Sequence, residues 1–234
     1  MAEAGVDRAV IAPPWWEQDA NEIALAAAAA HPQKFGVMGI YDPSDPRAAS
    51  GIESWLGQPH ILGIRLIFVG PSIRWLEEGS IDGFWAAAER LRIPLMIYPP
   101  RACHLVHRVA QRYPELTLII DHLGLQQRKT GPEAFECFAD ALALSRHPNV
   151  YAKVSSLPAY VSERYPFPGL TEPIRRAYDA FGPQRLMWGS DYTKLPCTYR
   201  ECLDHFRIAL DFLSADDRSW ILGRTAAQAL RWPS

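Results

Sequence analysis

The chain alternates short, almost wholly apolar segments with longer segments of helical pattern, and this alternation limits the fold more than any other feature. Short apolar runs bounded by turn residues are typical of strands that are buried on both faces. The expected strands are 6–11, 35–41, 61–68, 94–98, 116–121, 149–154 and 186–188. The expected helices are 21–30, 48–56, 82–91, 104–113, 132–145, 172–181, 199–213 and 216–230. Strands that alternate with helices predict an α/β fold built on a parallel sheet.

Two α/β folds share this pattern, and the carboxyl ends of the strands separate them. A dinucleotide-binding sheet carries G-x-G-x-x-G after its first strand, whereas this chain has Ala12-Pro13-Pro14-Trp15 there. A barrel gathers polar side chains at the carboxyl ends of many strands. Such side chains here are Arg65, Tyr98, Asp121, His122, Lys153, Ser155 and Asp191. The sequence therefore predicts a single domain over residues 1–234 with the architecture of a TIM (β/α)8 barrel.

The number of strands falls short of a closed barrel. A barrel of this type has eight strands, and the pattern supplies seven. The first residues, from Glu3 to Arg8, are typical of the tail of a helix that leads directly into a strand. We therefore expect the barrel to lack its N-terminal first strand unit.

Composition excludes several classes of protein. The net charge of -2 and pI near 6.4 do not favour nucleic-acid binding. No apolar run approaches the roughly 20 residues that span a bilayer, and the N-terminus has no signal-peptide pattern. The four cysteines show no C-x-x-C spacing, so neither a zinc knuckle nor a redox pair is indicated. We expect a cytoplasmic enzyme that binds neither nucleic acid nor membrane; a homo-oligomer is compatible with the composition.

Asp191 and His122 are the candidate catalytic residues. Asp191 follows the strand 186–188 after a flexible Gly189, where a carboxylate can activate water; an N-cap of the next helix is the competing interpretation. His122 can donate a hydrogen bond to a carbonyl oxygen as negative charge develops there, or it can be a hydrogen-bonded core histidine. Asp121 is assigned a structural role, because adjacent strand residues point to opposite faces.

Arg65 and Lys153 are candidates for binding an acidic substrate. Arg65 stands in an apolar strand, so it either forms an internal salt bridge or binds a substrate carboxylate. Tyr151, Lys153 and Ser155 alternate along one strand, and we expect their shared face to be the lumen. Ser155 and Tyr98 complete the predicted substrate site. Trp15, Trp16, Trp188 and Tyr192 can line the mouth together with Tyr98, although tryptophan is more often core packing.

A metal site is not indicated clearly. Catalytic zinc takes three protein ligands plus water, and only His122 and Asp191 are offered by strand ends. Cys103, His104 and His107 share the start of an amphipathic helix, and we interpret them as helix-surface residues. The metal ligands are therefore unknown: no cofactor is required by the sequence, and a single zinc ion is an alternative.

Several segments, in this order along almost the whole chain, resemble the amidohydrolase-related TIM-barrel hydrolases. They are His31-Pro-Gln-Lys-Phe-Gly-Val37 with Asp42-Pro43, Ile120-Asp-His-Leu-Gly124, Asn149-Val-Tyr-Ala-Lys-Val-Ser-Ser-Leu157, Leu186-Met-Trp-Gly-Ser-Asp191 and Ile221-Leu-Gly-Arg-Thr-Ala-Ala227. The branch of sugar-lactone and pyrone-dicarboxylate lactonases is the most similar. The family's first strand carries His-x-His, which this chain lacks. Tyr98-Pro99-Pro100 stands where metal-dependent decarboxylases of the superfamily place a histidine, and the lactonase branch similarly lacks that histidine.

The resemblance implies a hydrolase of a small lactone or cyclic ester, in which Asp191 activates water and His122 polarises the carbonyl. Two alternatives stay open. One is a metal-dependent decarboxylase or hydratase of the same superfamily. The other is an inactive barrel or partner protein, which the absent His-x-His would suit.

Overall fold

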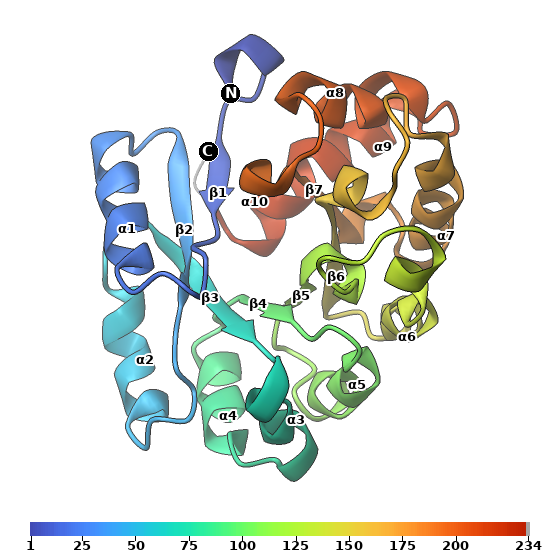
Figure 1. The fold of residues 1–234 in the computed structure, drawn as a ribbon. Helices are drawn as coiled ribbons and strands as arrows, with labels where there is room; N and C mark the ends of the chain where they lie inside the picture. Colours follow the sequence, from blue (N-terminus) through green and yellow to red (C-terminus); the bar gives the residue numbers. More distant parts are fainter. Residues whose placement is uncertain (233–234) are drawn as a thin grey trace.

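A computed structural model of the protein, which describes residues 1–232, contains one curled sheet of seven parallel strands (Figure 1). The strands follow the order of the sequence, each hydrogen-bonded to the next. They are β1 (Ala9–Ile11), β2 (Phe35–Ile40), β3 (Ile61–Ile67), β4 (Leu95–Tyr98), β5 (Leu118–Ile120), β6 (Val150–Ser155) and β7 (Leu186–Gly189). A parallel sheet in sequential order, curled around its own inner face, is the predicted barrel architecture.

The helices surround the curled sheet, except that α10 (Thr225–Ala229) lies between β1 and β7 and packs against the inner apolar cluster (Figure 1). The others are α1 (Ala20–Ala30), α2 (Ala48–Leu56), α3 (Arg74–Glu78), α4 (Asp82–Arg90), α5 (Cys103–Arg112), α6 (Phe138–Ala143), α7 (Thr171–Phe181), α8 (Tyr199–Asp204) and α9 (Ala215–Ser219). On α5, Val106, Val109 and Ala110 are buried while Arg108 and Arg112 lie on the outer face. This spacing buries one stripe of the helix against the sheet.

Alternation along the strands divides the interior into two apolar regions. Leu95 and Ile97 of β4 face the helices, in the large outer core. Met96 of β4, Ile119 of β5 and Met187 of β7 face the lumen, where they form a smaller cluster with residues of the last helix. Both faces of the sheet are thus buried, as near-continuous apolar strands require. Apolar packing fills the lower lumen and leaves its polar residues at the carboxyl ends of the strands.

Several helices differ in detail from the predicted segments. The segment 132–145 is divided into two 3-10 helices, η4 (Gly131–Phe135) and η5 (Leu144–Arg146), on either side of α6. The last two predicted helices each contain a π-helical stretch, η10 (His205–Ala209) and η11 (Trp220–Arg224). Helix α3 was not predicted, because five residues between Gly70-Pro71 and Gly79 are too few to show helical periodicity.

The sheet is open between β1 and β7, since each of these strands pairs with only one neighbour among the described residues. Side chains bridge the opening instead. Arg200 of α8 and Arg207 of η10 donate hydrogen bonds to the carbonyl oxygens of Glu3 and Ala4. Leu230, just after α10, joins the lumenal cluster with Met187 of β7 and Val10 of β1. That an eighth strand unit belongs in this opening stays a prediction. No described helix has the length and apolar character that crossing a membrane demands.

Candidate active site

Three neighbouring strands end in a residue with left-handed backbone geometry. His122 (φ 51°) follows β5, Ser156 (φ 59°) follows β6 and Asp191 (φ 50°) follows β7. Non-glycine residues rarely adopt positive φ, and such strain persists where the surrounding structure enforces it, often at functional sites. The three turns place the side chains of these strand ends around one point at the barrel mouth.

Asp121 lies at this site. Its structural role was predicted from the alternation of residues along a strand, but Asp121 is not part of the strand. The strand β5 ends at Ile120, and Asp121 begins the short 3-10 segment η3 (Asp121–Gly124). The left-handed turn at His122 then breaks the alternation. The side chains of Asp121 and His122 consequently lie in the same buried region, with residue exposures of 0% and 2%.

The Asp121 carboxylate holds two cations. Arg65 Nε lies 2.9 Å from Oδ2, and Lys153 Nζ lies 2.6 Å from Oδ1. Burial acts to raise the pKa of Asp121, but the charges of Lys153 and Arg65 outweigh it and hold that pKa far below its usual range. Arg65 also donates through Nη1 to the carbonyl oxygen of Pro13, 2.9 Å away, which ties the loop after β1 to the site. Of the two interpretations of Arg65, the internal salt bridge is therefore present in the structure.

His122 lies between Ser155 and Asp191. Its Nδ1 is 2.8 Å from Ser155 Oγ, and its Nε2 is 3.7 Å from Asp191 Oδ2. Burial lowers the pKa of His122 to about 4, even though the Asp121 and Asp191 carboxylates oppose the shift. The imidazole is therefore neutral near pH 7. Asp191 Oδ2 is buried and has no hydrogen-bond partner among the described residues, which is unusual for a carboxylate oxygen.

Tyr98 and Ser155 both lie against His122. The Tyr98 ring meets the imidazole edge-on at 5.7 Å, and its hydroxyl donates to the carbonyl oxygen of Leu125 at 3.0 Å. The same hydroxyl accepts a hydrogen bond from the backbone N–H of Gln127. Burial raises the pKa of Tyr98 to about 12. Tyr98 and Ser155 thus position His122; that they contact substrate stays a prediction.

The aromatic residues expected at the mouth separate into two groups. Trp15, Trp16 and Tyr192 are exposed on the loops after β1 and β7. Trp188 instead packs against the outer core and meets Tyr199 at 5.9 Å. Its place on β7 puts it on the face opposite Met187, so its assignment to the mouth was wrong.

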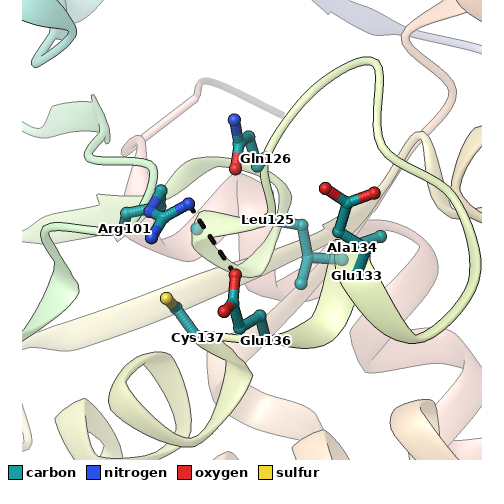
Figure 2. Close-up of a pocket in the computed structure, with 8 residues that line it drawn as sticks. Arg101, Leu125, Gln126, Glu133, Ala134, Glu136 and Cys137 are labelled. Atoms are coloured by element: carbon teal, nitrogen blue, oxygen red, sulfur yellow. Dashed lines mark ion pairs between the residues drawn. The ribbon is translucent and has the colours of Figure 1, made fainter.

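Two cavities of the structure lie away from His122 and Asp191. One, of about 10 Å³, has room for about one water molecule and lies beside the segment that follows η3 (Figure 2). Arg101 and Glu136 point toward each other across it, with 3.7 Å between Nη1 and Oε2. The other, of about 450 Å³, is a surface hollow lined by residues after β2, including Asp42, Asp45 and Arg47. The polar cluster at the mouth remains the strongest candidate site.

The residues at the start of α5 do not form a metal centre. Cys103 is buried, contrary to its expected surface position, because it packs beneath Gly124, where any Cβ would overlap its Sγ. His104 is exposed, and His107 Nδ1 lies 2.9 Å from His147 Nε2. Residues 1–232 contain no group of three His, Cys, Asp or Glu side chains arranged to hold an ion.

The His107–His147 pair predicts acid sensitivity. Burial, followed by the nearby charge of Arg146, lowers the pKa of both residues from 6.5. The unfolded chain binds protons at these positions before the folded chain does, so the free energy of unfolding should fall as the pH drops below about 6.5. Urea denaturation at pH 7.5, 6.0 and 5.0 measures this. The dependence of the free energy of unfolding on pH should be weaker in His107→Asn than in the wild type. His104→Asn, which changes an exposed neighbour, should keep the wild-type dependence. An equal pH dependence in both variants would contradict the pairing.

A curled parallel α/β sheet carries a neutral histidine after β5 and a carboxylate with an unpartnered oxygen after β7, an arrangement typical of barrel enzymes. Comparison with known proteins agrees. The chain belongs to the amidohydrolase family, whose model (Amidohydro_2) matches residues 1–232. A curated relative, the L-fucono-1,5-lactonase of Burkholderia ambifaria, is 31% identical over 201 residues, covering 82% of this chain and 67% of that protein.

Solved structures show the same fold. An amidohydrolase from Burkholderia multivorans with bound zinc has a TM-score of 0.85 at 24% identity, covering 100% of this chain and 86% of that one. A probable 2-pyrone-4,6-dicarboxylic acid hydrolase from Acinetobacter baumannii, with citric acid bound, has a TM-score of 0.78 at 19% identity, covering 99% and 86%. The 5-carboxyvanillate decarboxylase of Sphingomonas paucimobilis has a TM-score of 0.70 at 17% identity, covering 99% and 81%.

Proposed function

We propose that this protein hydrolyses a small lactone or cyclic ester, with Asp191 as the base and His122 as the group that polarises the carbonyl. The observation that carries the proposal is the buried, unpartnered Oδ2 of Asp191, which faces His122 Nε2 at 3.7 Å. A buried carboxylate oxygen without a donor is suited to accept a proton from water. The 31% identity to a lactonase supports the choice of substrate class.

The chemistry requires Asp191 to accept one proton and later to return it. Asp191 Oδ2 takes a proton from a water molecule whose oxygen attacks the lactone carbonyl carbon. Negative charge then develops on the carbonyl oxygen, where a hydrogen bond from His122 Nε2 stabilises it. The ring C–O bond breaks, Asp191 returns its proton to the leaving oxygen and becomes a carboxylate again, and the product is an open hydroxy acid.

The hydrogen bond between Ser155 and His122 decides which form of His122 is present. A neutral imidazole carries one N–H, and the partner of one nitrogen decides where that hydrogen resides. If the Ser155 hydroxyl donates to Nδ1, 2.8 Å away, the hydrogen is on Nε2 and points toward the mouth. The opposite arrangement, with Nδ1–H donating to Ser155, leaves a lone pair on Nε2 that would suit a metal ion.

The cations around Asp121 favour an acidic substrate. Arg65 and Lys153 contribute two positive charges and Asp121 one negative charge, so these three residues have one positive charge in excess, which faces the Asp191 carboxylate across His122. Such a field at a largely dehydrated site attracts an anion. We therefore assign Arg65 and Lys153 to substrate binding through this shared charge, in addition to their salt bridges.

A divalent ion is the second candidate, because the Burkholderia multivorans structure contains zinc. His122 Nε2 and the unpartnered Asp191 Oδ2 suit two ligand positions. Catalytic zinc takes three protein ligands plus water, and residues 1–232 offer no third ligand beside these two. The described residues therefore do not complete a zinc site, and the proposed chemistry includes no step through a metal.

A lactone panel tests the proposal. Purified protein is assayed for acid release from five- and six-membered lactones, neutral and carboxylated, with and without prior treatment with a chelator. We expect hydrolysis well above the spontaneous rate that survives chelation. Activity lost on chelation and restored by a divalent ion would favour the metal-dependent alternative. Release of carbon dioxide from aromatic carboxylates instead would favour the decarboxylase, and a folded protein inert in every assay would favour the inactive barrel.

A further inference from the structure

Two loops with exposed aromatic rings meet at the mouth, where Lys194 of one loop lies over Trp16 of the other. The loop after β1 carries Trp15 and Trp16, which are 48% and 54% exposed and meet edge-on at 5.9 Å. The loop after β7 carries Tyr192, which is 67% exposed, and Lys194. Exposed large aromatic side chains that gather at one place mark a binding surface more often than a chance arrangement.

Lys194 is held over this surface. It closes the 3-10 turn η9 (Tyr192–Lys194), in which its backbone N–H donates to the carbonyl oxygen of Asp191 at 2.9 Å. Its Nζ lies 4.9 Å from the centre of the Trp16 ring, within the range of a cation–π contact. The lysine therefore lies three residues from the proposed base, and the contact with Trp16 joins the two edges of the open sheet at the mouth.

The Asp191 carboxylate is the strongest charge acting on Lys194, but the two form no salt bridge within the described residues. Among the described residues Lys194 forms no salt bridge, whereas Arg65 and Lys153 both bind Asp121. Its pKa is lowered, first by burial and then by the charges of Arg65 and Arg128, although Asp191 and Asp121 oppose the shift. Arg128 is exposed on the loop after β5. Lys194, Arg65 and Arg128 place three positive charges around the Asp191 end of the site, and such a group of cations favours a bound anion.

We propose that Lys194, supported by Trp16, contacts the carboxylate of an anionic lactone and sets a preference for anionic over neutral lactones. The inference rests on the proposed lactone hydrolysis, and it adds a specificity residue that no motif of the sequence indicates. Lys194 contacts the remote acidic group while Asp191 and His122 act on the ring carbonyl. Arg65 and Lys153 add positive charge deeper in the same site.

The kinetic test compares two lactones of one ring size, a neutral aldonolactone and a lactone that retains a free carboxylate. Lys194→Met should raise KM for the carboxylated lactone by about 10-fold or more, as expected for losing a charge-assisted contact. It should leave kcat nearly unchanged and the neutral lactone unaffected. Trp16→Leu should shift KM in the same direction by less. The matched control is Lys34→Met, since Lys34 precedes β2 at the opposite end of the barrel.

A binding measurement separates this inference from the proposed function. A non-hydrolysable cyclic dicarboxylic acid is titrated into the wild type and Lys194→Met, and tryptophan fluorescence reports Kd. Weaker binding by about 10-fold in the variant supports the Lys194 site, even if neither protein hydrolyses any lactone. Equal Kd values, or equal KM values for the carboxylated lactone, in a variant with wild-type circular dichroism would overturn the inference while leaving lactone hydrolysis intact.

Discussion

Asp191→Asn is expected to lower kcat for lactone hydrolysis by about 10²-fold or more, in line with typical general-base contributions. The amide is nearly isosteric with the carboxylate but cannot take a proton from water. The fold should survive, because asparagine tolerates the left-handed geometry that residue 191 adopts at φ 50°. Steady-state kinetics measure the loss, and thermal denaturation confirms the fold.

Asp211→Asn is the matched control, since Asp211 is exposed in the outer helical layer. It should retain wild-type kcat. Turnover of Asp191→Asn close to that of the wild type would rule out Asp191 as the base. His122→Asn should also slow turnover, because the carbonyl oxygen would lose its donor.

Arg65→Met should cause the largest loss of stability. The substitution leaves the fully buried Asp121 carboxylate with Lys153 as its one remaining cation. Breaking a buried ion pair by removing one partner costs about 3–5 kcal/mol, because the other charge stays buried. Urea denaturation gives the free energy of unfolding. Arg224→Met is the matched control: its pair with Asp216 is exposed, and exposed pairs contribute about 0–1 kcal/mol.

The same variant separates the two interpretations of Arg65. If the shared charge of Arg65 and Lys153 attracts substrate, KM for a carboxylated lactone should also rise, by about 10²-fold for a fully buried contact. Lower stability with an unchanged KM would restrict Arg65 to its salt bridge. Arg65→Lys, which keeps the charge and loses the bond geometry, should fall between the wild type and Arg65→Met in stability.

The strands were predictable from sequence because their cause is local. Apolar residues buried on both faces form short uninterrupted runs, as in Leu95–Tyr98 and Leu118–Ile120, and these runs survive in the structure with shifts of a residue or two. The lumenal face of β6 was predictable for the same reason. A lysine in a strand must avoid the helical shell, and Lys153 does lie on the inner face with Tyr151 and Ser155.

The turns that assemble the site were not predictable, because their cause is tertiary. His122 and Asp191 adopt positive φ under the constraint of their surroundings, and no residue type other than glycine signals this conformation reliably. The alternation of residues along a strand therefore predicted the direction of the Asp121 side chain incorrectly. The partnership of Arg65 with Asp121 spans three strands, and it depends on register that local pattern does not specify. Lys194 belongs to no motif and gains its position only through the turn after Asp191.

The contact between the loops after β1 and β7 has a consequence for how the substrate specificity of this enzyme can diversify. The loops that carry Trp16 and Lys194 meet through a ring and an ammonium group, without strand hydrogen bonds between them. The side chains of Trp16 and Lys194 lie outside the buried ion pairs and the apolar lumen, so substitutions at these two positions should change the free energy of unfolding little. Selection can thus change which substrates bind while Asp191 and His122 stay the same. Homologues with different residues at positions 16 and 194 should accordingly differ in substrate preference while they catalyse the same reaction.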